Sequence, residues 1–500
     1  MIIKMKGKIF IISIAVFFIT ACYVDKGNYD YTAISDITIS GIETSYSKIA
    51  ASDTLKITPR IESTYNESDF EYTWLIYDKN NKCDTLGKDR NLNYLINNAP
   101  GTYTIFYYVK NKSNTYYSHT NTTLTVSTRY SLGHYILKET ASGDTDIDIL
   151  LNDGKLISDV LLKTQGTALS GAPKSMGILY NKQLTDPLSL TKSSANCIGI
   201  ITATNNYSIF NTSDMRLIFN PDNMFYEKQN ETPFKFITFM WNDVFLTNKG
   251  VFSEDNMSVG SGIFGFPSGE SGASQFWAFS TTTVGLVYWD ETNSRLLYTN
   301  YNAVASVLSN DLYPTTNYTC LFMGSYKGTA YALFKDKANS KMYLYIITAK
   351  SSSRPPVVSA VKEIPSTMRF YSASQYGSNE RTAQLIYFIE NNKPYYYDVV
   401  NNNEHEIPFT DLPSGETITY ISNRFDRNAT PKIDYLTIAT QNGGDYHLYM
   451  YNMVGGLPYG APARTVTGKG KVKETHFLNS TYEYMNDMYI GYGFDYGYSR

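Results

Sequence analysis

Apolar and polar positions divide the chain into one concentrated apolar run near its start and a long series of short alternating segments after it. The run spans Ile9 to Ile19, follows three lysines and ends at the small residues Thr20 and Ala21. A basic start, about 7–15 apolar residues and small residues at the cleavage point define a secretory signal. The run is too short for a membrane-spanning helix, which needs roughly 20 residues. We therefore predict that residues 1–21 are a cleaved signal peptide.

Cys22 stands directly at the predicted cleavage point, behind Ile19-Thr20-Ala21. This arrangement resembles the lipobox of bacterial lipoproteins, which implies cleavage before Cys22 and its acylation, with palmitate among the acyl chains. Several acyl chains give a stable membrane anchor, whereas one chain binds only marginally. The sequence thus predicts attachment to a lipid bilayer through Cys22, with residues 22–32 as anchor and linker. The alternative is an ordinary signal peptide beside a chance cysteine.

Residues 33–128 contain short segments of alternating apolar and polar residues, separated by clusters of Asn, Gly, Asp and Pro. This spacing predicts a β-sandwich. Trp74 lies within one segment and Tyr103 follows a Gly turn, as in immunoglobulin-like sandwiches, where a buried Trp faces the opposite sheet and a corner Tyr bonds to the backbone. The predicted strands are Asp36–Ser40, Thr54–Pro59, Glu71–Tyr77, Leu92–Ile96, Gly101–Lys110 and Thr122–Ser127.

Four segments resemble the PKD-like family of bacterial lipoproteins: Asp25–Tyr31, the strand around Trp74, the strand that begins at Gly101, and the closing strand Thr122–Val126. The resemblance implies a PKD-type domain with an immunoglobulin-like fold and a cell-envelope location beside outer-membrane nutrient importers of the starch-utilisation type. It implies no catalytic residues. PKD domains usually carry a Gly-Asp-Gly turn after the Trp strand, and Asp78–Asn81 replaces it here.

Residues 129–500 repeat one theme, in which an aromatic and aliphatic strand leads through a turn of Asn, Asp or Gly to another strand. The turns recur at intervals of roughly 38 to 53 residues, which is typical of a four-stranded β-propeller blade. We predict seven blades, with six or eight as neighbouring alternatives, closed by pairing of Gly133–Lys138 with the segment Glu474–Tyr498. Two or three stacked sandwiches are the other alternative. The turns are Asn152–Gly154, Asn205–Asn206, Asn242–Asp243, Asp290–Asn293, Asp336–Ser340, Glu390–Asn392 and Gln441–Gly444.

Composition supports an all-β fold and argues against two classes of site. The chain contains 45 Tyr and 25 Phe, which favour strands. Without the three signal-peptide lysines, 40 basic residues face 46 acidic ones, a formal charge of −6, so the chain lacks the basic surface that binds nucleic acid. Cys83, Cys197 and Cys320 are odd in number and lack CxxC spacing, which predicts buried or semi-buried thiols rather than a zinc site. The predicted fold is an Ig/PKD-like β-sandwich followed by a β-propeller.

Motifs for catalysis and metal binding are incomplete in this chain. Asp144–Asp148 (DTDID) begins like a calcium loop, but Ile149 and Lys155 stand where an EF-hand requires Gly and Glu. Its alternation instead predicts a strand with one polar face. No histidines pair at metal spacing, no HExxH or G-x-S-x-G motif occurs, and Ser253–Asp255 opens a sialidase Asp-box that lacks its Gly and Trp. We assign no catalytic residue, no metal ligand and no cofactor.

The longest Gly/Ser-rich stretch, Ser253–Ser274, is a candidate ligand-binding loop because long loops in compact domains are often functional. Within it, Phe264 and Phe266 either contact a ligand or pin the loop to the propeller. Most tyrosines are predicted to pack between blades, since Tyr has an apolar body and a polar tip. Two Asp-Thr-Leu segments, at Asp53 and Asp84, resemble acceptor sites for O-glycosylation of exported proteins.

Together, these features predict a non-catalytic, surface-exposed lipoprotein of the outer membrane that serves nutrient uptake. Its partners would be a glycan or peptide ligand and an importer complex, with the PKD-like domain as spacer and the mouth of the propeller channel as binding site. One alternative is a propeller-type glycan hydrolase or lyase, which would show clustered carboxylates, Arg or His with strongly shifted pKa values. The other is a purely structural assembly partner with a broad apolar patch.

Overall fold

The structure is a computed structural model that describes residues 36–185, 192–239, 242–254, 261–268, 272–279, 286–299, 304–308, 312–349, 355–379, 382–426 and 433–478. The predicted signal peptide and Cys22 lie outside these ranges. Within the described ranges, no helix combines the length and apolarity needed to cross a membrane. The chain divides into two compact units: Thr54–Leu95 and Thr102–Leu124 belong to the first, and Thr125 onward belongs to the second, together with the short segments Ser47–Asp53 and Ile96–Gly101.

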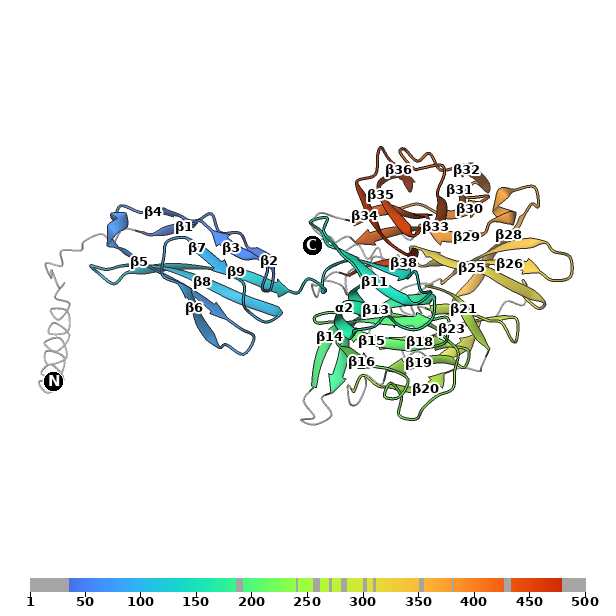
Figure 1. Ribbon diagram of the computed structural model, residues 1–500, viewed down its shortest axis with the longest axis horizontal. Coiled ribbons are helices and arrows are strands. Elements are labelled where there is room, and N and C mark those ends of the chain that lie inside the picture. Colours follow the sequence, from blue (N-terminus) through green and yellow to red (C-terminus); the bar gives the residue numbers. More distant parts are fainter. Residues whose placement is uncertain are drawn as a thin grey trace, which may run out of the picture. The chain divides into compact units, whose positions relative to one another are not determined.

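The first unit is a β-sandwich, as the sequence predicts (Figure 1). A five-stranded sheet has the order β2-β9-β8-β5-β6, and two smaller sheets pair β1 with β4 and β3 with β7. The strands are β1 (Thr38–Ser40), β2 (Ser45–Ile49), β3 (Thr54–Ile57), β4 (Arg60–Glu62), β5 (Phe70–Tyr77), β6 (Cys83–Gly87), β7 (Leu92–Leu95), β8 (Gly101–Asn111) and β9 (Tyr117–Ser127), with a 3₁₀ turn at Glu67–Asp69.

Trp74 lies at the centre of the sandwich core. It is fully buried, its indole stacks on Tyr107 with ring centroids 4.1 Å apart, and its Nε1 donates a hydrogen bond to the carbonyl of Asp89 at 3.0 Å. Tyr103, the tyrosine that the sequence singles out, lies half-buried earlier in β8. The tryptophan is thus buried, as the pattern predicts, and Tyr107 is the ring that stacks on it.

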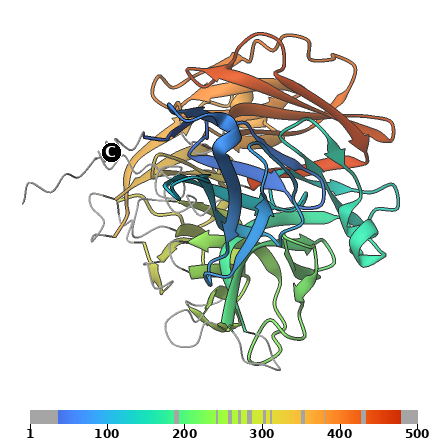
Figure 2. The same cartoon turned by 90° about the vertical axis from the view of Figure 1, so that its left-hand side faces the viewer.

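The second unit is a β-propeller, and its described residues form seven four-stranded blades, as predicted. The blades follow one another around the ring in the order of the sequence, from green to red in Figure 2. Blades 1–4 consist of β38 (Lys471–Leu478), β10 (Gly133–Glu139), β11 (Thr145–Leu150) and β12 (Leu156–Ile157); β13 (Pro173–Thr185), β14 (Lys192–Thr202), β15 (Tyr207–Asn211) and β16 (Leu217–Phe219); β17 (Pro233–Phe239), β18 (Asn242–Thr247), β19 (Gly250–Glu254) and β20 (Phe264–Ser268); and β21 (Ala273–Phe279), β22 (Leu286–Asp290), β23 (Arg295–Thr299) and β24 (Ala305–Val307).

Blades 5–7 have the same plan with small additions. Blade 7 has a short extra strand, β36, beside β35, while β37 also pairs with β35. Helix α2 (Val160–Gln165) follows blade 1, and a 3₁₀ turn at Arg369–Ser372 precedes blade 6. The strands are β25 (Tyr318–Tyr326), β26 (Thr329–Asp336), β27 (Met342–Thr348) and β28 (Val357–Ile364); β29 (Gln375–Ser378), β30 (Leu385–Glu390), β31 (Lys393–Asp398) and β32 (Asn403–Glu406); and β33 (Thr417–Asp426), β34 (Ile433–Asn442), β35 (Asp445–Val454), β36 (Leu457–Pro458) and β37 (Arg464–Lys469).

Most turns that the sequence aligned connect the two middle strands of a blade. Asn391 and Asn392, between β30 and β31, both have positive φ, which is what a tight type I′ hairpin requires and what Asn tolerates. Two turns do not fit the alignment. Asn242–Asp243 lies at the start of β18, and Asn152–Gly154 joins the two outer strands of blade 1. The predicted number of blades is therefore correct, but the aligned turns do not fall between the same two strands in every blade.

The ring closes in blade 1, where β10 pairs antiparallel with β38 from Gly133↔Leu478 to Glu139↔Lys471. In Figure 1 the red β38 accordingly lies with the blue-green β11 of the same blade. The predicted closing pair is confirmed for Gly133–Lys138 with residues 474–478, and residues 479–498 of the predicted segment lie outside the described ranges. Pairing with this distant strand covers the inner edge of β10 and gives blade 1 its innermost strand, β38.

Neighbouring blades approach closely at the centre of the ring. An added Cβ at Gly377 on β29 would lie 2.2 Å from the carbonyl oxygen of Ile421 on β33, and one at Gly177 on β13 would lie 2.1 Å from that of Phe236 on β17. Only glycine fits where backbones approach in this way. Farther out, buried aliphatic and aromatic side chains fill the space between sheets.

Candidate functional site: the central cavity of the propeller

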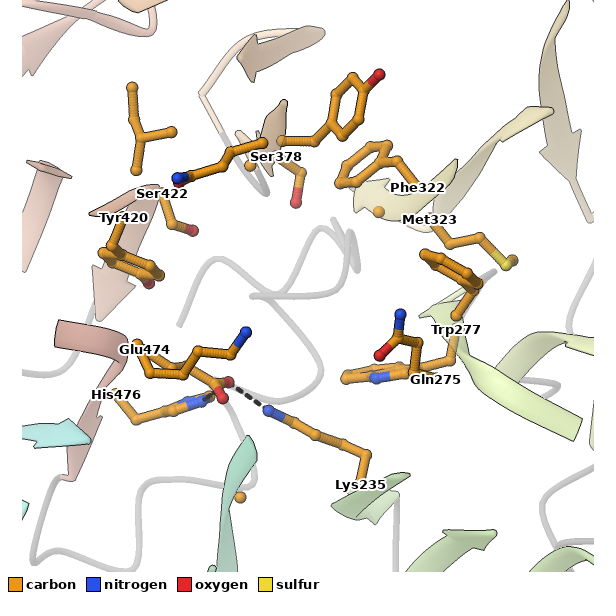
Figure 3. A pocket seen from close by; sticks show the side chains of 18 of the residues that line it. Lys235, Gln275, Trp277, Phe322, Met323, Ser378, Tyr420, Ser422, Glu474 and His476 are labelled. Atoms are coloured by element: carbon orange, nitrogen blue, oxygen red, sulfur yellow. Dashed lines mark hydrogen bonds and ion pairs between the residues drawn. The ribbon is translucent and has the colours of Figure 1, made fainter. Parts of the chain in front are cut away.

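The inner strand of every blade faces a central cavity of about 880 Å³. Runs of consecutive residues on these inner strands line the cavity, such as Gln275–Phe279 and Leu321–Ser325. The contributing strands are β38, β13, β17, β21, β25, β29 and β33. Figure 3 shows Lys235, Glu474 and His476 together on one side of the cavity, and Trp277 and Phe322 on the other, with Gln275 beside Trp277.

The polar part centres on Glu474 of β38. Its Oε1 accepts hydrogen bonds from Lys235 Nζ on β17 and lies 2.6 Å from His476 Nε2, and its Oε2 accepts one from the backbone N–H of Met176 on β13 at 3.1 Å. Figure 3 shows Lys235 and His476 converging on this carboxylate. One side chain thus connects the inner strands of three consecutive blades.

Opposing effects act on the ionisation of Glu474. Burial alone would raise its pKa, but the charges of Lys235 and His476 and their hydrogen bonds outweigh burial and hold the pKa well below its ordinary value. Glu474 is therefore an ionised hydrogen-bond acceptor across the physiological pH range. It is not a proton donor.

The aromatic part comes from blades 4, 5 and 6. Gln275 and Trp277 alternate along β21 and both line the cavity, and Phe279 meets the Trp277 ring edge-on with centroids 5.0 Å apart. Phe322 of β25 packs near Tyr376 of β29, with ring centroids 5.4 Å apart. Figure 3 shows Trp277 and Phe322 across the cavity from Glu474. This wall offers flat apolar faces with an amide beside them.

The two phenylalanines singled out by the sequence lie elsewhere in blade 3, and neither lines the cavity. Phe264 is fully buried and packs near Phe225, Phe245 and the Nζ of Lys182. It therefore has the packing role that the sequence left open as the alternative to ligand contact. Phe266 is 73% exposed on β20, so ligand contact at Phe266 stays a prediction.

The acidic repeat in β11 has a structural role. Asp146 accepts hydrogen bonds from the backbone N–H groups of Leu161 and Leu162 and so caps helix α2, at 2.8 and 3.1 Å. Asp148 forms a buried ion pair with Lys138 at 2.6 Å and accepts a hydrogen bond from Tyr446. No group of side chains suited to a metal ion occurs among the described residues.

A second buried charged cluster lies between blades 2 and 3. Lys182 Nζ pairs with Glu254 at 2.9 Å and lies 3.8 Å from Asp243, which also accepts a hydrogen bond from Thr238. Burial raises the pKa of Asp243 to about 7. The charge of Lys182 acts to lower this pKa, and the negative charge of Glu254 acts to raise it further. Two carboxyls thus share one ammonium, so one of them holds a proton readily.

The sequence does not reveal the cavity residues. Lys235, Trp277 and Glu474 belong to three different blades, and none stands in a recognisable motif. His476 is one of five histidines, and none of them pairs with another at metal spacing in the sequence. Aligning the inner strands of the repeats, rather than their turns, is the signal that would have grouped these residues.

Comparisons with known proteins agree with this description. Residues 22–173 match the PKD-like family, a range that begins at Cys22 and continues through the sandwich and β10–β12. The chain thus joins a PKD-like N-terminal region to a β-propeller. No curated protein sequence matches it.

Among solved structures, the chain is similar to a quinonprotein alcohol dehydrogenase-like protein from Bacteroides thetaiotaomicron, at 15% identity and a TM-score of 0.43, covering 89% of this chain and 99% of that one. It is also similar to the dihydro-heme d1 dehydrogenase NirN, at 9% identity and a TM-score of 0.40, covering 70% and 76%. It is similar to AztD from Citrobacter koseri as well, at 12% identity and a TM-score of 0.34, covering 81% of this chain and 100% of that one. These names span different activities, and a shared fold does not define a function.

Proposed function

We propose that the protein is an envelope-anchored lipoprotein that binds a glycan in the central cavity of its propeller without converting it. The observation that carries this proposal is the cavity, whose volume of about 880 Å³ lies within the roughly 300–1,000 Å³ of small-molecule sites. A sugar ring has apolar C–H faces and a rim of hydroxyl groups. Trp277 suits the former, and the polar groups of Gln275 and Glu474 suit the latter.

Binding without catalysis is supported by the state of Glu474. Hydrolysis of a glycosidic bond usually requires a carboxylic acid whose raised pKa keeps it protonated. Lys235 and His476 lower the pKa of Glu474 instead, so that it accepts hydrogen bonds from hydroxyl groups but does not donate a proton.

Membrane attachment through Cys22 is supported by the signal-peptide pattern before it and by the PKD-like match, which begins at this residue. A position on the outer membrane beside a nutrient importer follows from the family resemblance. We expect the chain to incorporate labelled palmitate and to partition into detergent, and the Cys22→Ala variant to do neither. Equal labelling of both forms would refute acylation at Cys22.

The binding site is tested with a panel of polysaccharides and peptides, measured by calorimetry, with product analysis on the same samples. We expect Trp277→Ala to weaken glycan binding roughly tenfold or more, because it removes a stacking ring. Phe266→Ala is the matched control, since it removes an exposed ring outside the cavity. Loss of binding in the control alone would move the site to β20, and turnover of any glycan would refute a binding-only role.

A further inference from the structure

The lining of the cavity carries more positive than negative charge, although the chain as a whole is acidic. Among the described residues, three lysines and two glutamates line the cavity, whereas the whole chain has a formal charge of −3. The lining residues are Lys235, Lys471, Lys473, Glu139 and Glu474. The sign of the cavity is thus opposite to that of the protein.

Two of these lysines face a glutamate. Lys235 forms its ion pair with Glu474. Lys471 lies directly opposite Glu139 in the antiparallel pairing of β38 with β10, and opposite charges at such positions attract each other. Lys473, in contrast, has no acidic residue opposite it in this strand pairing.

Lys473 lies at an irregularity in the closing strand pair. Val472 pairs with Lys138 and Glu474 pairs with Leu137, so Lys473 is an extra residue without a cross-strand partner. Lys473 and its neighbour Glu474 both line the cavity, as consecutive residues of other inner strands do. Within the described part of the chain, Lys473 is exposed and makes no hydrogen bond or ion pair.

We infer that the ligand is an acidic glycan, with a carboxylate of the sugar held at Lys473 while a ring stacks on Trp277. This inference rests on the proposed function of the cavity. A concave wall focuses the field of an uncompensated charge, so an anionic ligand is attracted and a cationic one is repelled. An acidic peptide has the same charge, but it lacks the rigid hydroxyl-rimmed ring for which the aromatic wall and Gln275 are suited.

The test uses the whole chain purified in detergent and three uronate polymers: polygalacturonate, alginate and hyaluronan. Each is compared with its carboxyl-reduced form, which keeps the backbone and loses the charge. We expect at least one acidic polymer to bind about tenfold more tightly than its reduced form, and this preference to shrink as salt rises. Equal binding of both forms would overturn the inference and leave the proposed function standing.

Two variants locate the effect. Lys473→Gln is expected to weaken binding of the acidic polymer about threefold, the size of effect typical for an exposed charge pair, and to leave binding of the reduced polymer unchanged. Lys471→Gln is the matched control on the same strand, because Glu139 faces that charge. Equal losses in both variants would overturn the role of Lys473. If no acidic, reduced or neutral polymer bound, both this inference and the proposed glycan-binding function would be overturned. Binding of an acidic peptide in the absence of any polymer binding would overturn both as well.

Discussion

Replacing Glu474 with glutamine tests the central feature of the propeller. The change keeps the size of the side chain and removes its charge. It leaves the ammonium of Lys235, whose side chain is only 10% exposed, without a counter-ion and weakens the link to Met176 and His476. Since Glu474 lies on β38 and its partners lie on β13 and β17, the loss falls on three inner strands together.

The structure sets the size of the expected effect. Removing one partner of a buried ion pair costs about 3–5 kcal/mol, because the remaining charge stays desolvated. The side chains of Glu474 and Lys235 are 17% and 10% exposed at an open cavity, so we expect the lower end of that range, ~3 kcal/mol. The melting temperature of the propeller should fall by several degrees.

The sign of the pH dependence is also determined. The pKa of Glu474 is lowered in the folded state, so its contribution is present above the unfolded-state pKa of about 4.3 and is lost as pH falls below it. Calorimetric melting at several pH values should therefore show a steep acid-induced loss of stability in the parent protein and a shallower one in Glu474→Gln.

Glu363→Gln is the control for this experiment. Glu363 pairs with Lys341 at 3.0 Å on the surface, where both side chains are about half exposed, so its loss should not change the melting temperature measurably. The stabilising role of Glu474 would be refuted if Glu474→Gln melted at the temperature of the parent protein, as this control should. It would also be refuted if the variant lost stability with falling pH as steeply as the parent.

Three further predictions concern other parts of the propeller. Burial raises the pKa of Asp243 to about 7, so its contribution to the free energy of unfolding is full below pH ~4 and is lost as pH rises toward 7. Urea unfolding should therefore show that Asp243→Asn is more stable than the parent protein at pH 7.5 but not at pH 4. Gly377→Ala should cost about 1–3 kcal/mol in the same assay, because its Cβ meets the backbone of β33, whereas Gly444→Ala, which has open space, should cost nothing measurable. Asp146→Ala should lower the free energy of unfolding by about 1–2 kcal/mol, because it removes the cap of helix α2. A metal chelator should leave the melting temperature of the parent protein unchanged; a change would indicate that calcium binds at Asp144–Asp148.

The fold was predictable because its determinants are local. Alternation over short segments marks strands, and residues such as Asn391 and Asn392 mark tight turns between them. Even the closing pair of β10 with β38 followed from the need of a ring to join its ends. The phase of single blades was harder, because Asn242–Asp243 has the composition of a hairpin turn but lies at the start of a strand.

The cavity was not predictable, for a related reason. Its chemistry arises where the ring brings distant strands together, and Lys235 and Glu474 become partners only after β38 has joined blade 1. For Phe264 the sequence left two interpretations open. An aromatic residue in a Gly-rich stretch suggests a ligand contact, yet its surroundings in the fold bury it completely.

The pairing of β10 with β38 also has a consequence for biosynthesis. A ribosome produces residues 133–139 long before residues 471–478, so blade 1 must wait for its inner strand until the remaining six blades have been made. During this interval β10 presents an open edge that can pair with other chains. A chain cut short before β38 would also lack Glu474 and one wall of the cavity. Completion of the ring therefore separates full-length chains, which carry the site, from truncated ones, which do not.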